Sequence, residues 1–154
     1  MPTRTEQILI IGPDAVSRKE LSRHLQNRGY YVTACESLAE GLVSLGADPP
    51  DVIFADLLPQ HIGELAQQAA IGEVEVPVIV LTAAETAQEV VAAMRAGAAE
   101  VVLKPIQDKG FVDDALGKLF ERVRVARLNE VYREELERKN LNEARDLLFR
   151  AMDS

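Results

Sequence analysis

Cysteine, histidine and tryptophan are scarce in this chain of 154 residues, which contains one, two and none of them. A single cysteine, Cys35, excludes an internal disulfide framework and a zinc cluster built from cysteines. The two histidines lie far apart, which disfavours a metal site built from histidine. No apolar run approaches the ~18 residues of a membrane helix, and the N-terminus lacks a secretory signal. These absences predict a cytoplasmic protein with a single core and no membrane partner.

Acidic residues outnumber basic ones by 25 to 17, and the formal net charge is −8. Residues 121–154 contain eight basic and eight acidic side chains, so the excess of negative charge lies in residues 1–120. An acidic body repels the phosphate backbone of nucleic acids. The charge distribution therefore predicts that the chain has no nucleic-acid partner.

Short apolar runs alternate with helical stretches along the first 105 residues. The runs predict strands at Ile8–Ile11, Tyr31–Ala34, Asp51–Ala55, Pro77–Leu81 and Val101–Leu103. The stretches between them predict helices at Ala15–Arg28, from a cap at Ser37 to Leu45, at Glu64–Ala70 and at Glu85–Ala96. Buried strands separated by helices form a parallel sheet covered on both faces. We therefore expect an α/β fold of the flavodoxin-like (βα)5 type, doubly wound, with strand order 2-1-3-4-5.

A long C-terminal helix is predicted after Gly110. The first part of this helix has an apolar stripe at helical spacing, which we expect to pack on the sheet. This part therefore belongs to a domain over residues 1–122. Residues 123–154 form a helical extension whose thinner stripe ends at Met152. Two interpretations stay open for this extension, a solvated linker and a helix that pairs with a second copy of itself. Its abrupt end favours a fragment of a longer protein.

Polar side chains follow the predicted strands where they end. Asp14 comes after the first strand, Asp56 after the third, Thr82 after the fourth and Lys104 after the fifth. The carboxyl ends of parallel strands share one edge of the sheet, where open α/β folds bind ligands. A carboxylate can attack a phosphoryl group, and an ammonium and a hydroxyl can bind its oxygens. The pattern predicts a site that forms an aspartyl phosphate.

The stretches ILIIGPD, PDVIFADLLPQHIG, VPVIVLTA and AGAAEVVLKP resemble the receiver domain of two-component response regulators. The resemblance covers residues 7 to about 122. It implies that Asp56 is the phosphoacceptor, that Thr82 is the switch hydroxyl and that Lys104 precedes a proline with a cis peptide bond.

The resemblance also implies a function in phosphorelay signalling. A histidine kinase or phosphotransfer protein would supply the phosphoryl group. The face formed by the fourth helix, the fifth strand and the fifth helix, together with the C-terminal helix, would carry the signal to an output domain or partner protein. A homodimer through the fifth helix and its extension is a further expectation. The chain would be no enzyme beyond self-phosphoryl transfer and slow autodephosphorylation.

Three departures from the family pattern stand out. Gly12 and Pro13 occupy the positions of the two acidic residues that hold Mg²⁺ in the family, and Asp14 comes one place late. The loop after Asp56 is one residue shorter than in the family, which displaces the backbone carbonyl of Leu58 from the position of the family's metal ligand. Asp56, Asp14 and the Leu58 carbonyl would therefore form a weakened Mg²⁺ site. Val101 replaces the switch aromatic, as in receivers of the sigma-S regulator type.

These departures support an alternative from another class of function. A pseudo-receiver would act without phosphorylation, as a scaffold for dimerisation and protein interaction. A phosphatase of the haloacid-dehalogenase type is disfavoured, because Leu58 occupies the place of its second aspartate. His24 is expected on the exposed face of the first helix, and His61 in the loop beside the site.

Overall fold

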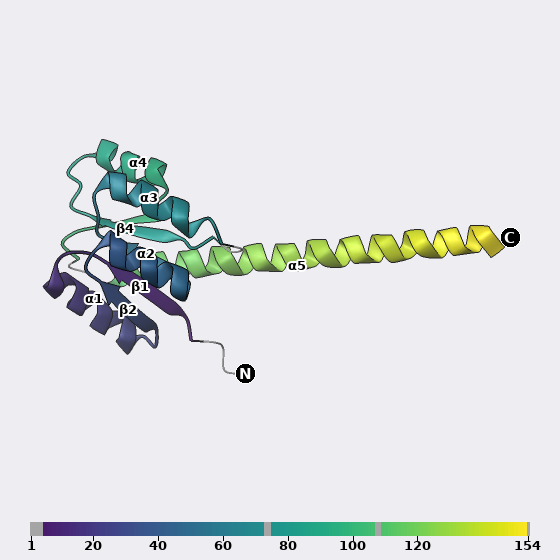
Figure 1. Cartoon of the computed structure of the whole chain (residues 1–154), viewed down its shortest axis with the longest axis horizontal. Coiled ribbons are helices and arrows are strands. Elements are labelled where there is room, and N and C mark those ends of the chain that lie inside the picture. Colours follow the sequence, from purple (N-terminus) through teal and green to yellow (C-terminus); the bar gives the residue numbers. More distant parts are fainter. Residues whose placement is uncertain (1–4, 73–74, 107–108, 154) are drawn as a thin grey trace. The chain divides into compact units, whose positions relative to one another are not determined.

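The computed structural model describes residues 5–72, 75–106 and 109–153. Five strands and five helices alternate in it (Figure 1). In chain order they are β1 (Gln7–Ile11), α1 (Ala15–Asn27), β2 (Tyr31–Cys35), α2 (Leu38–Ala47), β3 (Val52–Ala55), α3 (Pro59–Ala69), β4 (Val78–Thr82), α4 (Ala87–Ala96), β5 (Glu100–Leu103) and α5 (Gly110–Asp153). All strand pairs are parallel and the order is β2-β1-β3-β4-β5. The predicted flavodoxin-like (βα)5 fold with a long C-terminal helix is confirmed.

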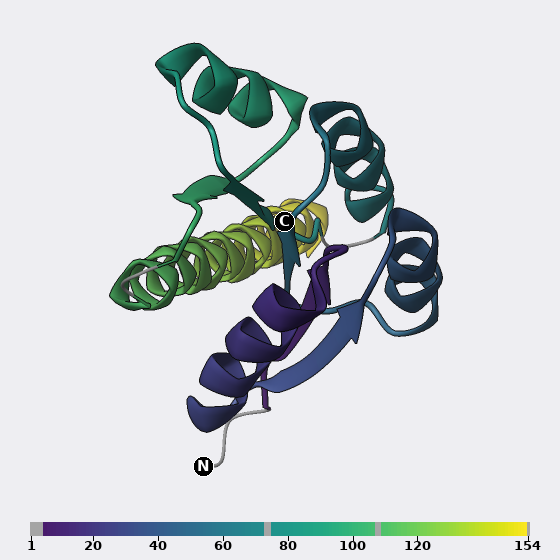
Figure 2. The same cartoon turned by 90° about the vertical axis from the view of Figure 1, so that its left-hand side faces the viewer.

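The sheet buries apolar side chains on both of its faces. Successive side chains of a strand point to opposite faces, and in β1 both sets are buried. Leu9 and Ile11 belong to the core that α2, α3 and α4 cover, together with Ile62 and Leu65 of α3. The opposite face of the sheet is covered by α1 (Figure 2). Each such apolar side chain contributes about 1.5–3 kcal/mol when it is fully buried, which explains why β1, β3 and β4 read as continuous apolar runs.

Side-chain caps fix where three of the helices begin. The predicted cap at Ser37 is present, since its hydroxyl accepts a hydrogen bond of 3.3 Å from the Glu40 N–H. The carboxylate of Glu40 accepts from the N–H of Glu36, one residue before the expected partner of a capping box. Thr86 caps α4 in the same way, at 3.2 Å from the Glu89 N–H. α1 is capped by an aspartate that belongs to the site described below.

Two predicted helix starts are wrong. α3 begins at Pro59 and not at Glu64, because proline at the first helical position has a suitable φ and needs no hydrogen bond from its nitrogen. α4 begins at Ala87 and not at Glu85, because Thr86 provides the cap. The earlier start of α3 matters for function, since it places this helix directly after the loop that follows β3.

α5 is one continuous helix over 44 residues. The chain divides into two compact units, residues 1–115 and 116–154, and α5 contributes to both. The predicted domain boundary at residue 122 stays a prediction. Among the helices of the described residues, none combines the length and apolarity that crossing a membrane requires.

Candidate functional site

Backbone hydrogen bonds hold the loops at the carboxyl edge of the sheet in place. The N–H of Asp56 donates to the carbonyl of Ile11 at 2.8 Å, so the residue after β3 is fixed to the end of β1. The N–H of Lys104 donates to the carbonyl of Thr82 at 2.7 Å, which joins the ends of β4 and β5. Three chemically active side chains from different strands therefore sit on one rigid edge.

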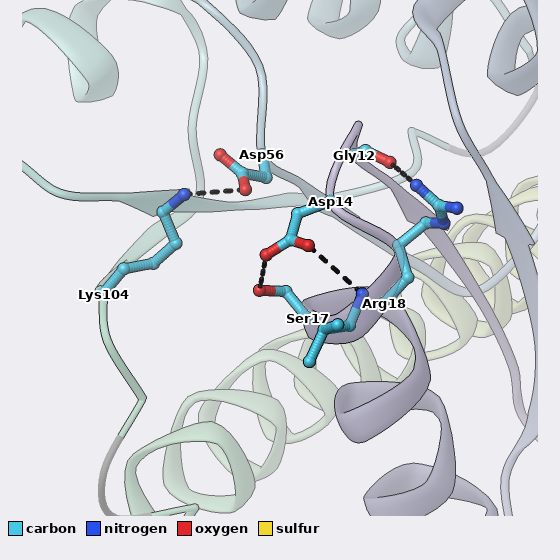
Figure 3. A network of polar contacts seen from close by, with 7 residues as sticks. Gly12, Asp14, Ser17, Arg18, Asp56 and Lys104 are labelled. Atoms are coloured by element: carbon cyan, nitrogen blue, oxygen red, sulfur yellow. Dashed lines mark hydrogen bonds and ion pairs between the residues drawn. The ribbon is translucent and has the colours of Figure 1, made fainter.

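Lys104 and Asp56 form the central contact of the site. The Lys104 Nζ lies 2.8 Å from Asp56 Oδ2 (Figure 3), although 48 residues separate them in the sequence. The two side chains are 30% and 22% exposed, respectively. A charge-assisted hydrogen bond of this length between half-buried groups is stronger than a surface ion pair. The structure thus brings together the carboxylate and the ammonium that the strand pattern indicated.

Thr82 shares a groove with Asp56. The groove is lined on one side by Leu58 and His61, which follow β3, and on the other by Thr82 and Ala83, which end β4. Thr82 is half-buried and the groove is open to solvent. An incoming group can therefore reach Asp56 between α3 and the loop after β4.

A second cavity, of about 140 Å³, lies on the other side of Asp56. Its lining includes Lys104 and, from the start of α1, Asp14, Ser17 and Arg18. The structure therefore gives Asp56 two neighbouring spaces of different chemistry. The groove has the threonine, and the cavity has the cationic side chains, among them Lys104 and Arg18.

Asp14 is committed to α1. Its carboxylate accepts hydrogen bonds from the Val16 N–H at 3.2 Å and from the Ser17 hydroxyl at 2.6 Å (Figure 3). The bond from Ser17, followed by that from Val16, lowers the pKa of Asp14. The predicted metal ligand is thus the N-cap of α1 in this structure.

The backbone carbonyl of Leu58, the other predicted metal ligand, also has hydrogen-bond partners. The Leu58 carbonyl accepts from the N–H of His61 at 2.9 Å and from that of Ile62 at 3.1 Å, as the residue that precedes α3. Leu58 becomes the cap because α3 begins at Pro59. Both lone pairs of this carbonyl oxygen therefore have donors.

The donor set does not fit the Mg²⁺ site that the fold family implies. A Cβ at position 12 would lie 3.1 Å from the Asp56 Cβ, so a carboxylate there would stand beside Asp56, but the residue is Gly12. Pro13 has no side-chain oxygen, and Asp14 binds its own helix. Within residues 5–72, 75–106 and 109–153, no three His, Cys, Asp or Glu side chains form a group that could hold a metal ion.

Arg18 is a member of the site that sequence reasoning missed. Its Nη1 donates to the Gly12 carbonyl (Figure 3), and its Nη2 lies 3.6 Å from Glu36. The Arg18 side chain is only 13% exposed. In the sequence, Arg18 does not differ from the other polar residues of α1. Its contact depends on how α1 packs beside the loop after β1, which the sequence alone does not show.

The two histidines differ from expectation. The prediction that His24 is exposed is wrong, since its side chain is 14% exposed and its Nε2 lies 2.9 Å from Asp113 of α5. The reason is tertiary, because the first turn of α5 brings a carboxylate to α1. His61 lies in α3 and not in a loop, again because α3 begins at Pro59.

The fold and the edge residues define a class of protein. A (βα)5 sheet with an aspartate, a threonine and a lysine at the carboxyl ends of β3, β4 and β5 is the architecture of a receiver-type signalling domain. The peptide bond between Lys104 and Pro105 is cis, as the resemblance implied. Residues 8–115 match the family described as the response regulator receiver domain, and the chain belongs to this family of two-component systems.

Known relatives agree with this assignment. Response regulator MprA of Mycolicibacterium vanbaalenii is 32% identical over 126 residues, which cover 80% of this chain and 50% of MprA. Virulence transcriptional regulatory protein PhoP of Salmonella typhimurium is 35% identical over 101 residues, which cover 64% of this chain and 45% of PhoP. The chain therefore spans about half the length of these curated relatives.

A solved structure supports the fold independently. The crystal structure of a two-component response regulator from Clostridium difficile matches with a TM-score of 0.69 and 16% sequence identity. The match covers 77% of this chain and 98% of that one. At this identity the likeness establishes the fold alone.

Proposed function

We propose that this receiver domain accepts a phosphoryl group on Asp56 from the phosphohistidine of a histidine kinase or phosphotransfer protein. The observation that carries the proposal is the pairing of Asp56 with Lys104 at 2.8 Å, beside the groove that Thr82 lines. A nucleophile needs an adjacent cation when a doubly charged phosphoryl group approaches it. The family supports the same reading, since its members are signalling domains and generally not enzymes.

The chemical step begins at Asp56 Oδ1, for which the described residues provide no hydrogen-bond partner. This oxygen forms a bond to phosphorus while the P–N bond of the phosphohistidine breaks. The electron pair of that bond leaves with the imidazole nitrogen, which takes up a proton from water. Lys104 turns from Oδ2 to a phosphoryl oxygen, and the Thr82 hydroxyl donates to another.

The output surface is proposed to be the face formed by α4, β5 and the first turn of α5. Val91 and Met94 of α4, Leu103 of β5 and Phe111 of α5 are large apolar residues that are 45–67% exposed. Exposed apolar clusters of this kind mark protein-interaction sites. The backbone N–H of Lys104, which follows β5, donates to the backbone carbonyl of Thr82. A movement of Thr82 would therefore be transmitted to β5 and to this face.

The helical extension would transmit the response. Its apolar side chains are exposed along the helix, among them Leu128, Leu136, Leu141, Leu148 and Met152. A second copy of the chain would bury these side chains in a homodimer, and an output domain or a partner protein would receive the change. A cytoplasmic location and the lack of a nucleic-acid partner for these residues remain part of the proposal.

Intact-mass spectrometry with phosphoramidate tests the proposal. We expect the wild type to gain the mass of one phosphoryl group in buffer with millimolar Mg²⁺, whereas Asp56→Asn gains none. Asp51→Asn is no control, because the Asp51 carboxylate accepts a bond from the Gln7 N–H. Asp114→Asn is a better one, since Asp114 is exposed on α5. A wild type that stays unmodified in every buffer would contradict phosphorylation.

The second candidate function is a scaffold that works without phosphorylation. The neutral pair Gly12 and Pro13 favours it, because these residues leave the family's metal site without its acidic side chains. In that case Asp56→Asn would leave partner binding and the oligomeric state unchanged. Sedimentation of the full chain, of Asp56→Asn and of a chain that ends at Arg122 would decide whether the extension pairs two copies and whether Asp56 controls the pairing.

A further inference from the structure

The loop after β1 is electrically neutral where it meets Asp56. A side chain at position 12 would begin 3.1 Å from the Asp56 Cβ, so acidic residues here would surround Asp56 with negative charge. A divalent cation offsets such a cluster and the phosphoryl group together. With Gly12 and Pro13 in place, the acids that line this cavity are Asp14, Glu20 and Asp56, and Lys104 pairs with Asp56 at 2.8 Å.

A second cation is held at the same loop. Arg18 donates to the Gly12 carbonyl and lines the 140 Å³ cavity that Asp56 and Lys104 also line. A guanidinium stays ionised at every working pH. Its acidic partner, Glu36, is 73% exposed and lies 3.6 Å away, so solvent screens that attraction. In the cavity behind Asp56, the cations Arg18, Lys104 and Lys109 therefore offset the acids Asp14, Glu20 and Asp56.

The remaining acid and carbonyl near Asp56 are both held at the start of a helix. The Asp14 carboxylate accepts from the Val16 N–H on one oxygen and from the Ser17 hydroxyl on the other, and these bonds orient it toward α1. The Leu58 carbonyl accepts from its two donors at the start of α3. The site thus combines a poor set of metal ligands with two cations of its own.

We infer that Lys104 and Arg18 supply the positive charge for phosphoryl transfer to Asp56, and that the transfer does not require a divalent cation. The inference rests on the proposed function of Asp56. Lys104 contacts the reacting carboxylate, whereas Arg18 is a positioning residue that fixes the Gly12 carbonyl and raises the potential in the cavity. The step with phosphoramidate balances without a metal: the Asp56 Oδ1–P bond forms, the P–N bond breaks, and ammonia leaves with its electron pair.

The test measures the rate of phosphorylation by phosphoramidate in EDTA and in millimolar Mg²⁺, with intact mass as the readout. We expect the wild-type rates to agree within about twofold, and Arg18→Gln to slow the reaction in EDTA about tenfold. Arg23→Gln is the matched control, since Arg23 is an exposed arginine of the same helix. It should react at the wild-type rate.

A restored acidic pair provides the converse experiment. In the double variant Gly12→Asp/Pro13→Asp, Mg²⁺ should accelerate the reaction at least about tenfold over EDTA. Paramagnetic broadening by Mn²⁺ gives a second readout that needs no reaction. The amide resonance of Asp56 should stay sharp in the wild type and broaden in the double variant, provided that both show folded spectra.

The outcomes separate this inference from the functional proposal. A wild-type adduct that forms with Mg²⁺ but not in EDTA overturns the inference and leaves Asp56 as the phosphoacceptor. Site-specific broadening by Mn²⁺ in the wild type also overturns it. An adduct that forms equally in both buffers supports it. The absence of any adduct overturns both proposals, and an Arg18→Gln rate equal to that of Arg23→Gln removes Arg18 from the mechanism.

Discussion

Asp113, in the first turn of α5, lies 2.9 Å from His24 in the last turn of α1. The same carboxylate is 3.0 Å from Arg28, the residue that follows α1, so Asp113 contacts both the last turn of α1 and its C-cap. Because this contact fixes the start of the long helix to the body of the domain, its removal should be measurable in stability.

Asp113→Asn should lower the free energy of unfolding by about 1 kcal/mol, because a charged hydrogen bond to a half-buried histidine is lost while the exposed Arg28 pair adds little. Urea unfolding followed by circular dichroism measures the change. Asp114→Asn is the matched control, since it removes a charge from an exposed neighbour. Equal midpoints for the two variants would show that the contact does not stabilise the fold.

Gly41 should not tolerate alanine. A Cβ at this position of α2 would overlap with the Ile11 side chain of β1, so Gly41→Ala should cost about 1–3 kcal/mol through overpacking. Gly46→Ala in the same helix meets no atom within 4 Å and should stabilise the helix by about 0.5–1 kcal/mol. Thermal unfolding of both variants tests the contrast. Ile11→Val removes the nearest methyl group and should partly rescue Gly41→Ala; without that rescue, the overlap with Ile11 is not the cause.

Cys35 should react slowly with thiol reagents. Burial, and to a lesser degree the Glu40 carboxylate, raises the pKa of this thiol, and the thiolate is the reactive form. We expect its reaction with a disulfide reagent at neutral pH to be at least about tenfold slower in the native chain than in the unfolded chain. Absorbance of the released thiol gives both rates. Similar rates would indicate that the end of β2 opens readily.

The charge on Asp14 should contribute to stability at neutral pH but not in acid. Its pKa is lower in the folded chain than its ordinary value, because the charged carboxylate accepts the bonds from Ser17 and Val16. This contribution is complete above the pKa of the unfolded chain and is lost as the pH falls through the lower folded value. The difference in urea midpoint between wild type and Asp14→Asn should therefore shrink on acidification. A difference that is constant with pH would mean that the charge is irrelevant to the cap.

Much of the fold could be predicted from local patterns. The apolar runs from Ile8 and from Val78 form strands because both of their faces are buried, and such runs are readable in one sequence. The cap at Ser37 was also visible, because its partner Glu40 lies three residues away. The start of α3 is harder to predict, because a proline such as Pro59 is common in loops as well as in a first helical turn.

The candidate site divides in the same way. Asp56 and Lys104 could be placed together because each follows a strand, and the sheet order puts the ends of β3 and β5 on either side of β4, within reach of a lysine side chain. Arg18 and His24 could not be placed, because their partners depend on how α1 packs against the loop after β1 and against α5. The sequence position of Asp14 predicts a ligand role and does not reveal that its carboxylate caps its own helix.

Asp56 lies between the groove and the cavity, since it lines both the groove with Thr82 and the cavity with Arg18. Under the proposed function, an incoming phosphodonor protein would make its contacts on the groove side, where Leu58 and His61 form the rim. The balancing charges sit on the other side. Changes along the rim can therefore alter which donor is recognised without disturbing the charge balance at the acceptor, so partner choice and reactivity can diverge independently in such a domain.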